Sequence, residues 1–299
     1  MDISVVVPRL PGPGMTVLGS AARFTAGGKG ANQAVAAARL GADVRMAGRV
    51  GGDDFGRRLV AGLQAEGIDA GPVRSAAATP SGLAMISVDG SGENLITVAP
   101  GANHEVGDTD VAAAFTEPGD VVVISAEIPV PAIRAALARA RGAVPCMLNL
   151  APAPQPAAEA AAIVADGVDW LVVNEPEAAA VLGKPVRGLA GAARAAAGLL
   201  AAGARNAVVT AGSQGAALAG AQGSATVPGF SVAAVDATGA GDTFVGALAV
   251  AIAAGVPAAD AVRAAAAAAA AAVTRYGAQA AMPRPADIRA VTGLAWPLA

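Results

Sequence analysis

The stretch Asp236-Ala237-Thr238-Gly239-Ala240-Gly241-Asp242-Thr243-Phe244 is the most informative part of this chain, because it combines small, flexible residues and two aspartates in one turn before an apolar helix. The glycines let the backbone approach a ligand, and the start of the helix offers unpaired N–H groups and a positive dipole end to an anion. Placing a carboxylate such as Asp242 beside a bound anion is electrostatically unfavourable unless the carboxylate has a chemical role. The indicated action is accepting a proton from a hydroxyl that attacks a phosphoryl group.

The composition of the 299-residue chain narrows its class. Hydrophobic residues make up 55% and charged residues 14%, which excludes a disordered chain, and the alanine surplus favours packed helices. The apolar run 264–273 is too short to cross a bilayer, so we expect no membrane segment. A net charge of −3 without a basic cluster gives no support for nucleic-acid binding. The single cysteine, Cys146, is expected to be buried and fits a reducing, cytoplasmic location without a signal segment.

Short apolar runs alternate with helical stretches along most of the chain. The runs predict buried strands of a mainly parallel sheet, and their alternation with helices predicts a layered α/β fold with right-handed crossovers. The expected strands lie at residues 43–50, 121–126, 146–150, 170–174 and 207–211. The expected helices lie at residues 31–40, 55–66, 130–141, 156–165, 189–202, 242–254, 259–275 and 285–292.

Two segments do not fit a parallel sheet. Residues 82–98 place strand-like runs on both sides of Asp89-Gly90-Ser91-Gly92, and an Asp-Gly turn between such runs is a strong hairpin signal. Residues 17–25 are short and mixed in character. We interpret both segments as a small antiparallel lid at the edge of the main domain; surface hairpins without a role are the alternative.

A second glycine cluster, Gly27-Gly28-Lys29-Gly30-Ala31-Asn32-Gln33-Ala34, lies at the start of the first expected helix. The backbone can approach a small polar ligand there, and Lys29 and Asn32 can bond its hydroxyl groups. The cluster is not a Walker A loop, because Gly30 follows the lysine where Ser or Thr is required, and the chain has no G-x-G-x-x-G. Taken alone, the cluster could be a simple loop-to-helix turn.

With these motifs the chain resembles the ribokinase-like (PfkB-type) carbohydrate kinases over essentially its whole length. The stretches that carry the resemblance are 27–42, 51–56 (Gly-Gly-Asp-Asp-Phe-Gly), 90–103, 174–177 (Asn-Glu-Pro-Glu), 210–213 (Thr-Ala-Gly-Ser), 236–244 and 273–279. The resemblance implies a three-layer α/β/α fold and one kinase domain over residues 1–299, with lid segments at about 8–25 and 79–99. It also implies a homodimer formed through the lid.

The resemblance further implies an ATP-dependent sugar kinase that phosphorylates D-ribose at its 5-hydroxyl. Acceptors that remain open are 2-deoxyribose, fructose or another furanose, and an adenosine-like nucleoside. A catalytically weak sugar- or nucleotide-binding protein is the alternative from another class. The intact Asp242, Asn174 and Glu177 argue against that alternative.

Roles for individual residues follow from the resemblance. Asp242 would be the general base, and the backbone N–H groups of Gly239, Ala240 and Gly241 would form the anion hole. The sugar would contact Asp2, Gly28, Lys29, Asn32, Glu127 and Asp242. ATP would contact Asn174, Thr210, Gly212, Gly215 and Gly241.

Two kinds of metal ion are implied as well. Asn174 and Glu177 would hold Mg²⁺; an N-cap with a first-turn acid is the alternative for this Asn-x-x-Glu pair. A monovalent cation, expected to be K⁺, would lie among Asp236, Thr238, Ala272, Arg275, Gly277 and Ala281, mostly through backbone carbonyls.

The beginning of the chain departs from the family pattern. Family members start with an apolar central strand that ends in Asn-x-Asp, and here Met1-Asp2 stands where that strand would finish. We therefore expect this central strand to be missing, with Asp2 as the remaining sugar-binding aspartate. Either the natural protein is longer or the affinity for sugar is weakened.

Overall fold

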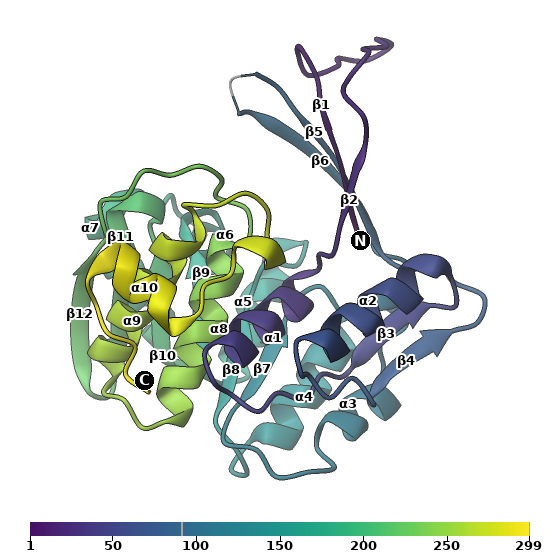
Figure 1. Ribbon diagram of the computed structural model, residues 1–299. Helices are drawn as coiled ribbons and strands as arrows, with labels where there is room; N and C mark the ends of the chain where they lie inside the picture. Colours follow the sequence, from purple (N-terminus) through teal and green to yellow (C-terminus); the bar gives the residue numbers. More distant parts are fainter. Residues whose placement is uncertain (91, 299) are drawn as a thin grey trace.

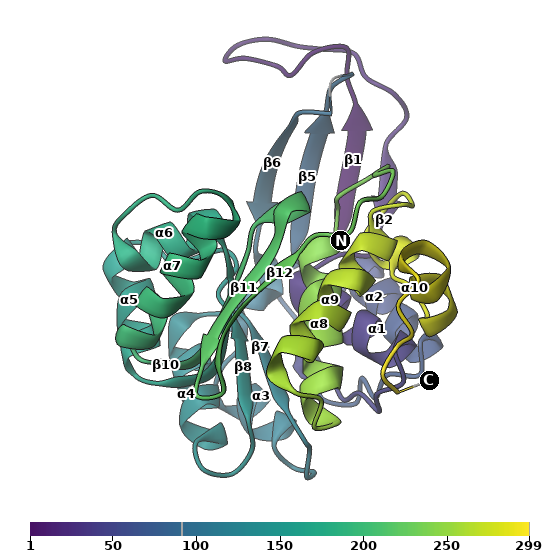
Figure 2. The ribbon, with the colours of Figure 1, turned by 90° about the vertical axis from the view of Figure 1, so that its left-hand side faces the viewer.

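The computed structural model describes residues 1–90 and 92–298, so Ser91, in the turn expected within the lid hairpin, lies outside the described residues. A six-stranded sheet forms the middle layer, and helices pack against both of its faces (Figures 1 and 2). The predicted three-layer α/β/α architecture is therefore confirmed.

The central sheet has the strand order β12–β11–β10–β9–β8–β7. The strands β7 to β10 are parallel, and the antiparallel pairs β10–β11 and β11–β12, which were not predicted, extend one edge. Four of the five expected strands are confirmed in this sheet. The bounds are β7 (Val122–Ser125), β8 (Cys146–Asn149), β9 (Val168–Asn174), β10 (Ala204–Thr210), β11 (Gly215–Gly220) and β12 (Gly223–Pro228).

The helices divide between the two faces of the sheet (Figure 2). One face carries α5 (Ala157–Ala165), α6 (Glu175–Leu182) and α7 (Gly188–Ala201), and the other carries α1 (Lys29–Arg39), α8 (Ala240–Ala253) and α9 (Ala258–Ala272). The remaining helices are α2 (Asp54–Ala65), α3 (Asp108–Ala114), α4 (Val130–Ala140) and α10 (Pro285–Thr292), with 3₁₀ turns η1 (Gly101–Glu105), η2 (Gly212–Gln214) and η3 (Gln279–Ala281). All eight expected helices are present, whereas α3 and α6 were not predicted. Among the described residues, no helix combines the length and apolarity needed to cross a bilayer.

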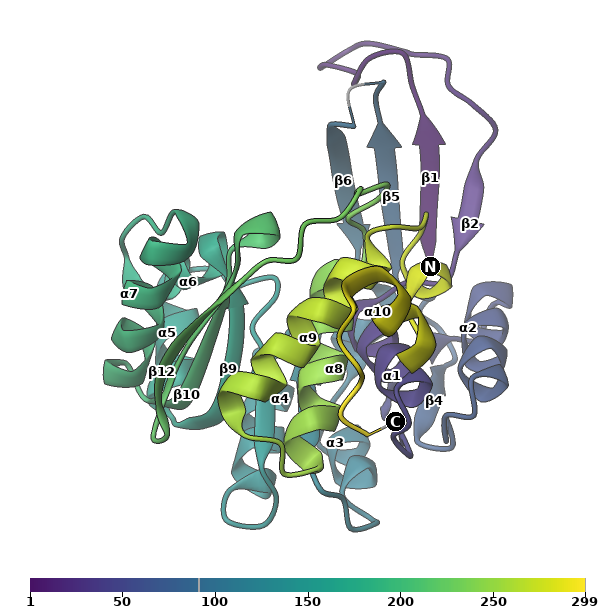
Figure 3. The same ribbon diagram turned by 60° about the vertical axis from the view of Figure 1, so that its left-hand side comes forward.

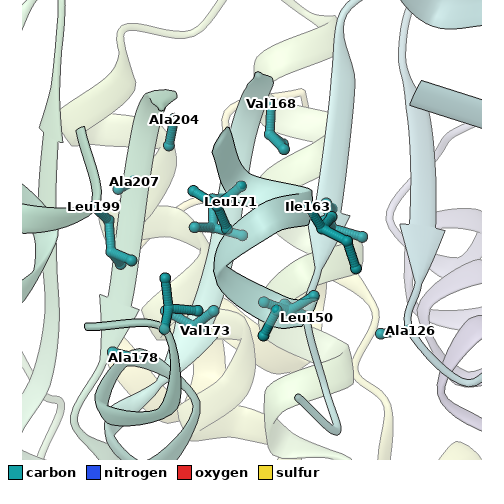
Figure 4. Packing of buried hydrophobic residues seen from close by; sticks show 14 of the residues in the cluster. Ala126, Leu150, Ile163, Val168, Leu171, Val173, Ala178, Leu199, Ala204 and Ala207 are labelled. Atoms are coloured by element: carbon teal, nitrogen blue, oxygen red, sulfur yellow. The ribbon is translucent and has the colours of Figure 1, made fainter. Parts of the chain in front are cut away.

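The strand β9 shows why this sheet is the centre of the core. Its residues alternate between two apolar clusters: Leu171 and Val173 pack with α5 and α7, while Trp170 and Val172 pack with α8 and α9. Figure 4 shows the first cluster around Leu171 and Val173. Because a strand directs successive side chains to opposite faces, a continuous apolar run is buried on both sides.

The prediction that residues 43–50 form a strand of the central sheet is wrong. The strand is shorter, β3 (Gly48–Gly51), and it pairs in parallel with β4 (Val73–Ala76) in a separate two-stranded sheet. Arg45 contributes only an isolated bridge to Asp69. Apolar periodicity identifies a strand but not its partner, and here the partner is the segment that follows α2.

The lid is a four-stranded sheet in the order β2–β1–β5–β6 that projects from the body (Figure 3). The hairpin of β5 (Leu83–Val88) and β6 (Asn94–Ala99) confirms the hairpin prediction. The lid is not wholly antiparallel, because β1 (Asp2–Val6) runs parallel to β5 while it pairs antiparallel with β2 (Arg23–Thr25). Residues 2–6 thus form a lid strand, and β7 is the outermost strand on its side of the central sheet as described.

The helices α1 and α8 pack closely against each other at Gly246. A Cβ atom at Gly246 would lie 2.6 Å from the backbone oxygen of Gln33 and 2.8 Å from the Cβ of Ala36. Real Cβ atoms do not tolerate such distances, so glycine is required for this helix spacing. Gly246 lies one turn after Asp242, and the close approach therefore brings the start of α1 alongside the start of α8.

We predict that Gly246→Ala lowers the free energy of unfolding by about 1–3 kcal/mol, because the added methyl group has to push α1 away. The matched control is Gly62→Ala in α2, where no atom lies within 4 Å of the added Cβ. That control should raise stability by about 0.5–1 kcal/mol. Urea denaturation measures both, and a Gly246→Ala protein as stable as Gly62→Ala would contradict the close packing.

Candidate active site

Asp242 lies in the first turn of α8 and is only 7% exposed. Asn32 Nδ2 donates a hydrogen bond to its Oδ2 at 2.9 Å, and Gln33 Nε2 donates one to its Oδ1 at 3.2 Å. Both donors come from the first turns of α1, which the contact at Gly246 holds nearby. Each carboxylate oxygen keeps a further lone pair that can accept a proton from a ligand hydroxyl.

The pKa of the Asp242 carboxyl group is raised, chiefly because burial disfavours the charged form. The Lys29 ammonium group and the hydrogen bonds from Asn32 and Gln33 oppose this effect. A carboxylate with a raised pKa is a stronger proton acceptor than a solvated one. The environment of Asp242 therefore suits a general base.

Three other carboxyl groups share this region with Asp242. The pKa values of Asp2, Glu127 and Glu177 are all raised, first by burial and further by the negative charge of Asp242. Lys29 lowers the pKa of each of them. These four acidic groups outnumber the two cationic groups beside them, Lys29 and the Met1 ammonium group, so the site stays negative overall and a polyphosphate would need a cation beside it.

The structure brings the predicted sugar-binding residues to one place at the base of the lid. Glu127 Oε2 accepts a hydrogen bond from the backbone N–H of Lys29 at 2.8 Å, so this carboxylate from the end of β7 caps α1. Asp2, at the start of β1, lies directly against Gly27, where a Cβ atom would be 2.2 Å from both of its carboxylate oxygens. The glycine cluster therefore allows α1 to begin beside two acidic side chains.

The start of α8 is the turn predicted to bind an anion, and one of its three predicted donors is already engaged in a hydrogen bond. Gly239 is the N-cap residue, and Thr243 N–H donates to its carbonyl at 2.8 Å as the first bond of the helix. Ala240 N–H donates to the carbonyl of Ala237 at 3.2 Å, so this predicted anion donor is engaged within the turn. The N–H of Gly241 lies in the first helical turn, where a helix has no intrahelical acceptor. Gly241 thus lies next to Asp242 as the best-placed donor.

Asn174 and Glu177 form a capping box at the start of α6. Asn174 Oδ1 accepts from Glu177 N–H at 2.9 Å, and Glu177 Oε2 accepts from Asn174 N–H at 2.8 Å. The alternative interpretation as an N-cap therefore holds, and it leaves the carboxylate of Glu177 with lone pairs for a hydrated Mg²⁺. One carboxylate and an amide oxygen suit this ion, which keeps several waters and binds phosphate oxygens. No group of three His, Cys, Asp or Glu side chains suited to a metal occurs among the described residues.

The predicted nucleotide-binding residues gather at the carboxyl ends of two parallel strands. Thr210 pairs with Asn174 across β10 and β9, and Thr210 Oγ1 donates to the carbonyl of Val173 at 3.4 Å. Gly212 begins η2 and Gly215 begins β11, so both glycines follow Thr210 closely in the chain. Ligands of open α/β sheets bind at this edge.

Asp236 ties together two of the loops predicted to surround a monovalent cation. Its Oδ1 accepts from Thr238 N–H and Oγ1–H at 2.9 and 2.6 Å, and its Oδ2 accepts from Gly277 N–H at 2.8 Å. Although partial burial acts against it, these bonds lower the pKa of Asp236. The side chain of Arg275 points elsewhere, because it pairs with Asp287 at 2.9 Å. Ala272 ends α9 and Ala281 lies buried in η3.

Three amide side chains around Asp242 were not among the predicted site residues. Gln33 contacts Asp242 directly, Asn149 accepts from Gln33 Nε2 at 3.0 Å, and Gln279 Nε2 donates to Asn32 Oδ1 at 3.1 Å. Gln33 and Gln279 lie inside motifs that the sequence singled out, so their polar character within an apolar pattern was the available signal. Asn149 gave a weaker signal, because it is a single polar residue at the end of a buried strand.

Comparison with solved structures places this architecture among the ribokinase-like folds. Ribokinase from Thermotoga maritima superposes with a TM-score of 0.83 at 32% identity, covering 97% of this chain and 95% of that one. Ribokinase from Arabidopsis thaliana, solved with ribose and ATP, gives a TM-score of 0.82 at 30% identity, covering 96% and 94%. The model of the pfkB family of carbohydrate kinases matches residues 1–285, and the chain belongs to this family.

The sequence comparison with a curated relative agrees with the comparison of structures. The ribokinase of Bacillus subtilis (strain 168) is 38% identical over 181 residues. The aligned part spans 60% of this chain and 60% of the relative, which is less than two thirds of that protein.

Proposed function

We propose that this protein transfers the γ-phosphoryl group of ATP to the 5-hydroxyl of D-ribose. The observation that carries the proposal is the placement of Asp242: a buried carboxylate, fixed by two amide donors, beside the anion-binding start of α8. The choice of ribose and ATP is supported by relatives named ribokinase and by the Arabidopsis thaliana structure with both ligands. The protein would act as a single kinase domain over residues 1–299, in which β1 (Asp2–Val6) joins the predicted lid segments at about 8–25 and 79–99.

The geometry suggests how the reaction would proceed. The sugar lies against Asp2, Lys29 and Asn32 at the base of the lid, and Asp242 accepts the proton as the hydroxyl oxygen attacks the γ-phosphorus. The N–H of Gly241 and the helix dipole stabilise the negative charge that spreads over the transferring group. Lys29 partly offsets the charge of the acidic side chains. ADP leaves as the P–O bond to its β-phosphate breaks.

Mg²⁺ would be held beside the phosphates by Glu177 and Asn174. When bound, it supplies the positive charge that neutralises the phosphate oxygens next to this acidic site. Thr210, Gly212 and Gly215 lie on the same sheet edge and would contact the nucleotide.

An assay of ADP release over D-ribose, 2-deoxyribose, fructose and adenosine tests the substrate. We expect the highest kcat/KM with D-ribose, and Asp242→Asn should lower kcat by about 10²–10⁴-fold because the base is lost. ATP binding, followed by calorimetry, should persist in this variant.

The matched control is Asp260→Asn, which changes an exposed aspartate in the first turn of α9 and should retain full activity. A folded protein without turnover on any acceptor would refute the kinase activity. Near-full activity of Asp242→Asn would remove Asp242 from the base role.

We also propose that K⁺ binds among residues 236–238, 272, 275, 277 and 281 and supports activity. The hydrogen bonds of Asp236 hold two of these loops together. We predict higher turnover in K⁺ buffer than in buffer with Na⁺ alone, and Asp236→Ala should abolish the difference. Equal rates of the parent protein in the two buffers would contradict K⁺ activation.

The lid supports a proposal of a homodimer formed by two lids. Several of its large apolar side chains are exposed to solvent, with Ile96 53% and Val98 60% exposed on β6. Covering such residues in a second copy would remove apolar area from water. We predict a dimer by light scattering and a monomer for Ile96→Lys, whereas the control Leu298→Lys, at an exposed leucine outside the lid strands, should stay dimeric. A parent protein that is monomeric at assay concentration would contradict the proposal.

A further inference from the structure

Gln33 is a buried amide that touches the proposed base, although it is not among the residues expected to bind sugar, ATP or metal. It is 3% exposed, and its Nε2 uses both hydrogens: one bonds Asp242 Oδ1 at 3.2 Å and the other bonds Asn149 Oδ1 at 3.0 Å. Its own oxygen, Oε1, is buried without a hydrogen-bond partner among the described residues. An unpaired buried acceptor is unfavourable, so packing alone does not explain a glutamine here.

The orientation of the Gln33 amide is fixed by its neighbours. Turning the amide over would place Oε1 against two acceptors, the carboxylate of Asp242 and Asn149 Oδ1. Asn149 is itself fixed, because its Nδ2 donates to the backbone carbonyl of Val172 at 3.1 Å. The main chain of β9 therefore orients Asn149, Asn149 orients Gln33, and Gln33 presents an N–H group to the base.

We propose that Gln33 and Asn149 are positioning residues for phosphoryl transfer: together they hold the Asp242 carboxylate in its ionised form and in the rotamer that faces the acceptor hydroxyl. This inference rests on the proposed function, in which Asp242 is the base. Asn32 binds the other carboxylate oxygen and is in turn held by Gln279, so the carboxylate is fixed from both sides.

The charged groups that face Asp242 are Lys29 from α1, Asp2 from β1, Glu127 after β7 and Glu177 from α6. The three acidic groups favour protonation of Asp242, whereas Lys29 opposes it. Gln33 opposes it as well, because its N–H group bonds the charged form. Loss of this donor should therefore raise the pKa of Asp242 further.

The test is the pH dependence of kcat/KM in Gln33→Met, which has a similar length but no donor. Activity requires ionised Asp242, so the rate falls as the pH drops through its pKa. The acidic limb of Gln33→Met should lie about one pH unit above that of the parent, the scale expected for a hydrogen bond to a charged group. Gln64→Met, at an exposed glutamine of α2, is the matched control and should leave the limb in place.

The variant Asn149→Ala tests the positioning of Gln33 without removing a contact to Asp242, because Asn149 bonds Gln33 and not Asp242. We expect a smaller shift in the same direction, since Gln33 remains but is less well held. This variant also carries the test if Gln33→Met does not fold. A purely structural role would lower the melting temperature and leave the acidic limb unmoved, and that result would overturn the inference.

The ¹³C titration of the Asp242 carboxyl group distinguishes failure of this inference from failure of the proposed function. Its midpoint should be higher in Gln33→Met than in the parent whether or not the protein turns over sugar. If Asp242→Asn keeps full activity, the proposed base is wrong; if Asp242→Asn is inactive and the midpoint in Gln33→Met is unchanged, only the role of Gln33 is wrong.

Discussion

The close contact of α1 with α8 at Gly246 is the constraint on which the site depends. The backbone oxygen of Gln33 occupies the space that a Cβ at Gly246 would need, so the two helices can approach only because that side chain is absent. One turn before this contact, the amides of Asn32 and Gln33 reach the carboxylate of Asp242. The packing of two helices thereby fixes the geometry of the proposed base.

The second determinant is the balance between burial and charge. Asp242, Asp2, Glu127 and Glu177 have raised pKa values because each loses solvent, and Lys29 offsets only part of the repulsion among them. Removing a carboxylate from water is expensive unless hydrogen bonds compensate, and the amides supply this compensation at Asp242. Because the same acidic groups would repel a polyphosphate, cations would have to accompany it into the site. The proposed general base and the proposed metal–nucleotide site are thus compatible with one arrangement.

Much of the architecture follows from local sequence. Buried apolar runs such as Leu171–Val173 and the helical stretches between them specify the α/β layers, and the two glycine clusters mark helix starts that approach ligands. The strand at Gly48–Gly51 pairs outside the central sheet, contrary to the prediction, because periodicity does not identify a pairing partner. The bond from Gln33 to Asp242 joins residues 209 positions apart, so only the packed structure reveals it. The lid strand Asp2–Val6 likewise depends on pairing with β5, which is distant in the sequence.

The most direct test of this account is the ¹³C titration of the Asp242 carboxyl group in the parent protein, with the resonance assigned by its loss in Asp242→Asn. Burial among α1, α8 and the other acidic groups predicts a pKa above that of an ordinary aspartate, despite the amides and Lys29. A pKa at or below the ordinary value would show that the carboxylate is solvated. Such a result would contradict the enclosure of Asp242 by α1 and α8.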